Sequence, residues 1–177
     1  MSRRVLVAGV GNVFLGDDGF GVEVANRLSD EAFPAGVQVA DFGIRGVHLA
    51  YELLQGYDTL ILVDAAPRGE APGTVFVLEP DFEHADRLER GESGFVLDAH
   101  GMDPEMVLGI LADLGGRRPR VLIVGCEPAE VREHMGLSAP VMLAVEEAAR
   151  VVRELVEQEC GREPAGRQTT TEREAGE

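Results

Sequence analysis

Three side chains suited to metal binding, those of Asp18, Asp64 and His100, each lie close to the end of a predicted structural element. Asp18 belongs to a glycine-rich loop, residues 9–21, that follows an aliphatic strand and opens a helix. Asp64 ends a second aliphatic run, and His100 comes shortly before another predicted helix. An open α/β sheet gathers ligand-binding groups at the carboxyl ends of its strands. Two carboxylates and an imidazole that meet there would form a divalent metal site.

Each of these residues also has an ordinary structural explanation when it is taken alone. Asp18 would serve as the N-cap of the following helix, and Asp64 would accept hydrogen bonds from amides at the strand ends. His100 would be a solvated loop histidine. Because Asp17 and Asp18 are consecutive and cannot both cap one helix, one of them needs a cation, another partner or solvent. The three residues together favour the metal site.

Short aliphatic runs alternate with helical periodicity along the chain, which predicts a three-layer α/β/α fold. The sheet should be twisted and mostly parallel, with helices on both faces and right-handed crossovers. The expected strands are residues 4–9, 37–41, 59–64, 74–78 and 120–125, and helices are expected from residues 20, 47, 103 and 138. The 74–78 strand follows a Pro-Gly turn and should lie near a sheet edge. Asp103 and Ser138 are the expected caps of the last two helices.

The chain length and composition indicate one domain. The chain has 177 residues, of which 45% are hydrophobic, enough for one well-packed core. We expect a single α/β domain over residues 1–159 and a disordered polar tail over 160–177, because the tail has almost no apolar side chains to bury. Residues 79–99 form the longest predicted connection, a surface loop or short helix.

The charge of the chain limits its partners. A formal net charge of -16 opposes binding to nucleic acid or to an anionic membrane, and we expect neither as a partner. The two cysteines, Cys126 and Cys160, are far apart and show no disulfide framework. The first apolar run, residues 5–10, is too short for a signal peptide. These features predict a cytoplasmic protein, with a monomer as the default.

A nucleotide site is the main competing interpretation of the glycine-rich loop. Gly9 and Gly11 follow the first strand, and Asp41 ends the second, where an acid would bind a ribose. Phe14, however, stands where the fingerprint needs its third glycine, and we expect this side chain to block the close approach of the helix. Paired acids would also place negative charge where pyrophosphate should bind.

An ordered set of short motifs resembles the maturation endopeptidases of nickel-iron hydrogenases. The resemblance runs from the first strand to the C-terminal helix and omits only the tail. The motifs, in chain order, are Gly-Val-Gly-Asn at 9–12, Gly-Asp-Asp-Gly-Phe-Gly at 16–21, Val-Asp-Ala at 63–65, Asp-Ala-His-Gly at 98–101, Val-Gly-Cys-Glu-Pro at 124–128 and Met-Gly-Leu-Ser at 135–138.

The resemblance implies an α/β endopeptidase, a hydrolase that removes the C-terminal extension of a hydrogenase large-subunit precursor after nickel insertion. It implies that Asp18, Asp64 and His100 contact the metal and act in catalysis, with Asp17 supporting the loop. Asp41 matches a further acid of the family and is the fourth catalytic candidate. The Asp-Phe-Gly-Ile-Arg-Gly sequence at 41–46 departs from the family's usual Gly-Gly-Thr form after this acid.

Nickel is the expected metal, and we expect the substrate's cysteines to carry it. Zinc or another divalent metal would also suit the site, because carboxylate and imidazole ligands accept several such ions. The chain has no His-Glu-x-x-His motif, which argues against an ordinary zinc peptidase. If a carboxylate acts as the base, Asp41 and Asp17 are the candidates.

Two other function classes stay open from the sequence. Cys126 would act as a nucleophile with His100 as its base, if both reach the same sheet edge. A nucleotide-binding or metal-sensing α/β protein without protease activity is the non-enzymatic alternative.

Overall fold

The computed structural model describes residues 3–81 and 103–162. Within them, five strands form one sheet in the order β2-β1-β3-β5-β4. The strands are β1 (Val5–Val10), β2 (Val37–Gly43), β3 (Thr59–Ala65), β4 (Val75–Leu78) and β5 (Arg120–Cys126). Strand β4 pairs antiparallel with β5, whereas the other pairs are parallel. The mostly parallel sheet and the edge position of 74–78 are therefore confirmed.

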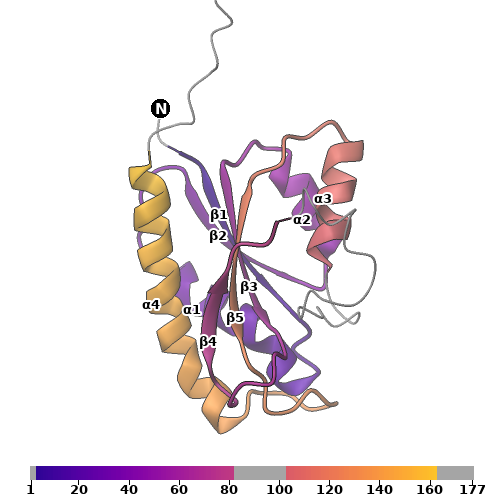
Figure 1. Cartoon of the computed structure of the whole chain (residues 1–177), viewed down its shortest axis with the longest axis vertical. Helices are drawn as coiled ribbons and strands as arrows, with labels where there is room; N and C mark the ends of the chain where they lie inside the picture. Colours follow the sequence, from indigo (N-terminus) through magenta and orange to yellow (C-terminus); the bar gives the residue numbers. More distant parts are fainter. Residues whose placement is uncertain (1–2, 82–102, 163–177) are drawn as a thin grey trace, which may run out of the picture.

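Helices cover both faces of the sheet (Figure 1). The described helices are α1 (Phe20–Ser29), α2 (Gly46–Leu53), α3 (Pro104–Asp113) and α4 (Ala139–Gly161), with a short 3₁₀ turn, η1 (Gly16–Gly19), before α1. Helices α1 and α4 pack on one face, and α2 and α3 on the other. Alternate residues of β1, β3 and β5 point into these two cores, which is why their sequences are continuously apolar. The expected three-layer α/β/α fold is confirmed.

The ends of the helices test the expected caps. Asp103 caps α3, because its Oδ1 accepts a hydrogen bond from the Glu105 amide at 2.9 Å. Ser138 occupies the N-cap position of α4, but its hydroxyl makes no capping bond there. Helix α4 continues through Gly161, past the expected boundary at 159. The expected tail from 163 onward, and the part of the 79–99 connection after 81, lie outside the described residues.

A glycine in the first turn of α1 lets that helix lie directly against the sheet. A Cβ atom on Gly21 would lie 2.0 Å from the Val63 carbonyl oxygen and 2.4 Å from that of Val10. Phe14 does not lie between helix and strand, since its side chain is 64% exposed. The expectation that Phe14 blocks the helix is therefore wrong. Gly21 is the residue that lets α1 approach the sheet closely, and it lies seven positions after position 14, where the nucleotide fingerprint would place its third glycine.

No helix in the part of the chain that the structure describes combines the length and the apolar composition needed to cross a membrane.

Candidate active site

Asp18 lies in η1, in the segment that joins β1 to α1. Its Oδ2 atom accepts a hydrogen bond from the Asn12 amide at 2.8 Å. Helix α1 has Gly19 at its N-cap position, with no side-chain capping bond. Asp18 is therefore not the cap of α1, and its carboxylate is held instead by the loop that follows β1. Only 9% of its surface is exposed.

Gly11 allows the two loops of the site to meet. It adopts a φ of +129°, and a Cβ atom there would lie 1.8 Å from the Asp18 carbonyl oxygen and 3.8 Å from Asp64 Oδ1. A side chain at Gly11 would thus collide with the backbone that carries Asp18. The glycine at this position brings the end of β1, the η1 turn and the end of β3 into one small space.

Asp64 is the second acid at this position, near the end of β3 and only 8% exposed. Burial raises the pKa of this carboxyl well above its usual range, and repulsion from Asp18 raises it further. A hydrogen bond from the Ala65 amide acts in the opposite direction. Asp64 thus does accept an amide hydrogen bond, but that bond does not offset the burial and the neighbouring charge.

Two buried carboxylates with mutual repulsion are a suitable donor set for a cation. A divalent ion bound between them would offset this repulsion, and carboxylate oxygens accept nickel, zinc or manganese. Among residues 3–81 and 103–162, no group of three histidine, cysteine or acidic side chains is close enough to hold a metal. The expected third ligand, His100, lies outside the described residues. The complete three-residue site therefore stays a prediction.

Asp41 reaches the same edge of the sheet from β2, where it pairs in register with Gly9 of β1. Its Oδ1 atom lies 3.7 Å from the position of a Cβ atom on Gly43, and the Gly43 carbonyl oxygen accepts the Gly11 amide at 3.0 Å. Unlike the other two acids, Asp41 is exposed. Its carboxylate is therefore accessible to water, as a general base would need to be.

Asp17 points into the protein and not toward the other acids. Its side chain is 0% exposed and accepts four hydrogen bonds, from the amides of Ala129, Glu130 and Ser138 and from the Ser138 hydroxyl. Although burial acts in the opposite direction, these hydrogen bonds lower the pKa of Asp17. A carboxylate that is buried and already bonded to four donors is poorly placed to take a proton from water. The structure thus argues against Asp17 as the base.

The sequence indicated that one of the two adjacent aspartates needs a partner, but it gave no way to find that partner. The donors to Asp17 lie more than 110 positions away, in the connection between β5 and α4. Glu127 is a further buried acid, to which the sequence assigned no individual role. It is 6% exposed, and its Oε2 atom accepts the Arg68 amide at 2.6 Å.

Cys126 does not have the surroundings of a nucleophile. It is 0% exposed and belongs to the core between the sheet and helices α1 and α4. Burial, followed by the negative charge of Asp17, raises the pKa of its thiol to about 12. Because the reactive form of cysteine is the thiolate, this arrangement argues against the Cys126 mechanism.

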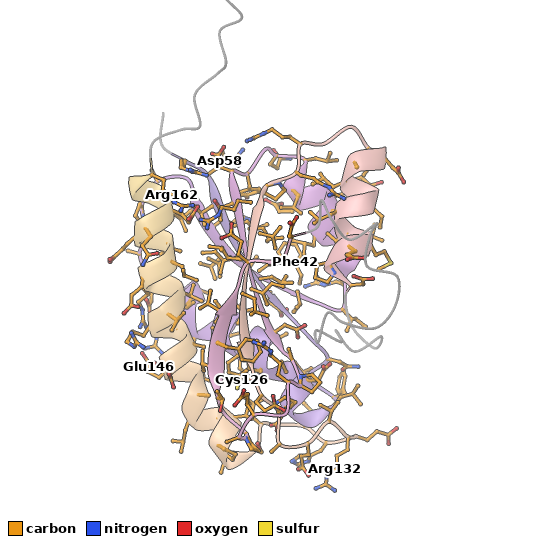
Figure 2. The ribbon with its side chains drawn as sticks, viewed as in Figure 1. Phe42, Asp58, Cys126, Arg132, Glu146 and Arg162 are labelled. Carbon is orange, nitrogen blue, oxygen red and sulfur yellow. The ribbon has the colours of Figure 1, made fainter. Side chains whose placement is uncertain are left out.

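The site lies at the end of the molecule that also carries the connection from β5 to α4. Figure 2 shows Cys126 and Arg132 at this end, whereas Asp58 and Arg162 lie at the opposite end. The backbone of the connection contacts the first loop directly, because the Gly16 amide donates to the His134 carbonyl oxygen at 2.7 Å. The loop that carries Asp18 is thus in direct contact with a segment far away in the sequence.

Comparison with known proteins identifies the family of the chain. The family model described as "Hydrogenase maturation protease" matches residues 22–155. The chain is 34% identical over 156 residues to the hydrogenase expression/formation protein HupM of Azotobacter chroococcum, covering 85% of this chain and 70% of that protein. It is 31% identical over 161 residues to HupD of Rhodobacter capsulatus, covering 85% and 72%.

Solved structures similar to this chain are also hydrogenase maturation peptidases. The hydrogenase maturating endopeptidase HybD from E. coli superposes with a TM-score of 0.69 and 28% identity, covering 88% of this chain and 93% of that one. The hydrogenase 2 maturation peptidase of a Thaumarchaeota archaeon gives a TM-score of 0.66 and 29% identity, with 88% and 99% covered. The family model and these relatives match most of the chain, and the chain therefore belongs to the hydrogenase maturation protease family, whose members are endopeptidases.

Proposed function

We propose that this enzyme removes the C-terminal extension of a nickel-iron hydrogenase large-subunit precursor after nickel has been inserted. In this proposal, Asp18, Asp64 and His100 recognise the nickel that the precursor already holds. The observation that carries the proposal is the pair of buried, mutually repelling carboxylates of Asp18 and Asp64 at one edge of the sheet. Because the two negative charges repel each other, binding of a cation between them is favourable.

The nickel is a part of the substrate, so it would act as a check on the precursor. Contact between the two carboxylates and the bound metal would hold the scissile segment in one orientation, and orientation of reacting groups is itself a large part of catalysis. A precursor without nickel would leave the two carboxylates without their cation and would bind in the wrong position. Cleavage would then follow only correct metal loading.

Asp41 is the residue we propose as the base that activates the attacking water. It lies at the same edge of the sheet and is exposed, whereas Asp17 is enclosed by four donors. Asp41→Asn keeps the size of the side chain and removes its ability to accept a proton. We expect a fall in the cleavage rate of about 100-fold or more, in line with the usual contribution of general acid–base catalysis.

The decisive experiment incubates the purified enzyme with nickel-loaded precursor and with the same precursor free of nickel. Mass spectrometry then follows the appearance of the shortened subunit. The parent enzyme should cleave only the loaded precursor, and Asp18→Ala, Asp64→Asn and His100→Ala should cleave neither. Glu154→Gln, on the exposed face of α4, is the control for loss of an acidic side chain away from the site.

Two results would overturn the proposal. Normal cleavage of loaded precursor by a folded Asp18→Ala variant would show that this carboxylate does not recognise the metal. Equal cleavage of the nickel-free precursor by the parent enzyme would show that nickel is not recognised at all.

A further inference from the structure

Two acids with consecutive positions in the chain carry out different tasks in this structure. The Asp18 carboxylate lies beside Asp64 at the edge of the sheet, and the Asp17 carboxylate lies inside the protein. Both belong to η1, a single turn of four residues. Any displacement of Asp17 is therefore passed to Asp18 through one peptide unit.

The turn is attached to the rest of the protein on two sides. On the side of β1, the Asn12 amide holds Asp18 Oδ2 at 2.8 Å. On the other side, Asp17 Oδ1 accepts the Ser138 amide at 2.6 Å, and Oδ2 accepts the amides of Ala129 and Glu130 at 2.8 and 3.0 Å. The Ser138 hydroxyl donates the fourth bond, also to Oδ2, at 2.8 Å.

The backbone continues this attachment. The amide of Asp17 itself donates to the Glu130 carbonyl oxygen at 3.2 Å, and the His134 amide donates to the Phe14 carbonyl oxygen at 3.0 Å. Leu15 and His134 also form an isolated parallel bridge. The backbone of residues 14–17 is thus hydrogen-bonded to the β5–α4 connection at several points, and we expect the position of the turn to depend on that connection.

The bonds to Asp17 also explain why an aspartate is suited to this position. All four partners are donors, and an ionised carboxylate is an acceptor only. An asparagine of the same shape would direct its NH₂ group at one or more N–H donors. The Ser138 hydroxyl is used here and not as a cap of α4, which indicates that the bond to Asp17 takes precedence over helix capping.

We propose that Asp17 is a positioning residue, which fastens the η1 turn to the β5–α4 connection and so sets where the Asp18 carboxylate meets the substrate's nickel. This inference rests on the proposed function, because it assigns a cause for the location of Asp18. It does not require Asp17 to touch substrate, metal or water.

The test measures cleavage of nickel-loaded precursor per folded enzyme molecule, with kcat and KM determined separately. Asp17→Asn should lower kcat by about 100-fold, the usual effect of misplacing a reacting group by about 1 Å. The change in KM should be much smaller, because the surfaces that dock the precursor are unchanged. Val152→Ala, on the buried side of α4, is a control that lowers the melting temperature without changing the turn.

A second variant tests the same attachment while leaving Asp17 in place. Ser138 has a φ of −63°, which a proline ring adopts without strain. Ser138→Pro removes both the amide and the hydroxyl donor, and we expect a fall in kcat of about tenfold. Ser138→Ala removes the hydroxyl alone and should have a smaller effect. If Asp17→Asn does not fold, Ser138→Pro decides the question by itself.

The outcomes separate this inference from the proposed function. Full kcat in folded Asp17→Asn or Ser138→Pro, with Asp18→Ala inactive, would overturn the positioning role alone. A kcat loss no larger than that of Val152→Ala at a matched melting temperature would also overturn it, since the effect would then be one of stability. Normal cleavage by Asp18→Ala would instead overturn the proposed function.

Discussion

Replacing Gly21 by alanine is a sharp test of how the fold supports the site. The new Cβ atom would lie 2.0 Å from the Val63 carbonyl oxygen, whereas ordinary van der Waals contact begins at 3.4 Å. Because the atom it meets is backbone in a central strand, the neighbour cannot rotate away. Helix α1 would have to retreat from the sheet by about 1.4 Å.

Two effects of opposite sign contribute to the stability of this variant. Alanine is favoured over glycine inside a helix by about 1 kcal/mol. Overpacking a well-filled core costs about 1–3 kcal/mol, and the upper end applies where backbone atoms collide. We therefore expect Gly21→Ala to lose about 2 kcal/mol of unfolding free energy, and its melting temperature to fall by about 4–8 °C for a domain of this size.

Gly109→Ala in α3 is the matched control. It makes the same chemical change inside a helix, but a Cβ atom there meets nothing within 4 Å. Only the helix preference acts, so this variant should gain about 0.5–1 kcal/mol. Urea denaturation of the parent, Gly21→Ala and Gly109→Ala measures both changes in unfolding free energy.

The same variant reports on the active site. Helix α1 directly follows η1, so a retreat of the helix would also move Asp18 and should lower precursor cleavage by about 100-fold. If Gly21→Ala proved as stable as Gly109→Ala and cleaved the precursor normally, the close approach of α1 to the sheet would not be what fixes the site.

Three further predictions test other parts of the structure. Hydrogen bonds from Arg153, together with its positive charge, lower the pKa of Glu31 from 4.5 to about 2. The contribution of this pair to stability is therefore present above pH about 4.5 and is lost as the pH falls toward 2, and acid titrations of Arg153→Gln and the parent should differ in this window. Cys126→Ser should keep its cleavage activity, and the buried Cys126 thiol should react with iodoacetamide only on unfolding, whereas loss of cleavage in the folded variant would restore the nucleophile mechanism. Asp103→Ala removes the cap bond to the Glu105 amide and should cost about 1 kcal/mol in thermal denaturation, while an unchanged melting temperature would show that this cap contributes nothing.

Much of the fold follows from local patterns in the sequence. The runs that became β1, β3 and β5 are aliphatic throughout because both of their faces are buried, and this pattern appears in the sequence without any long-range information. The same holds for Asp103 and Pro104, whose types fit the start of a helix. The edge position of β4 was also predictable from its short run after a turn.

Part of the candidate site also follows from local sequence. The sequence shows that Asp41 and Asp64 lie near the ends of strands and that Asp18 lies in the loop after a strand, and parallel strands bring their ends to one edge. The ordered motifs also indicate the protease family from the sequence alone. These conclusions need only the order of residues along the chain, because each depends on one strand and the loop directly after it.

Only the tertiary structure decided which of the two adjacent aspartates faces the site. Asp17 and Asp18 have the same side chain and the same local surroundings, and what separates them is a set of donors more than 110 residues away. The role of Gly21 was hidden for the same reason, since the carbonyl oxygens that exclude a Cβ atom belong to β1 and β3. Local sequence specifies which elements form, whereas close contacts between elements distant in the chain determine what each polar side chain does.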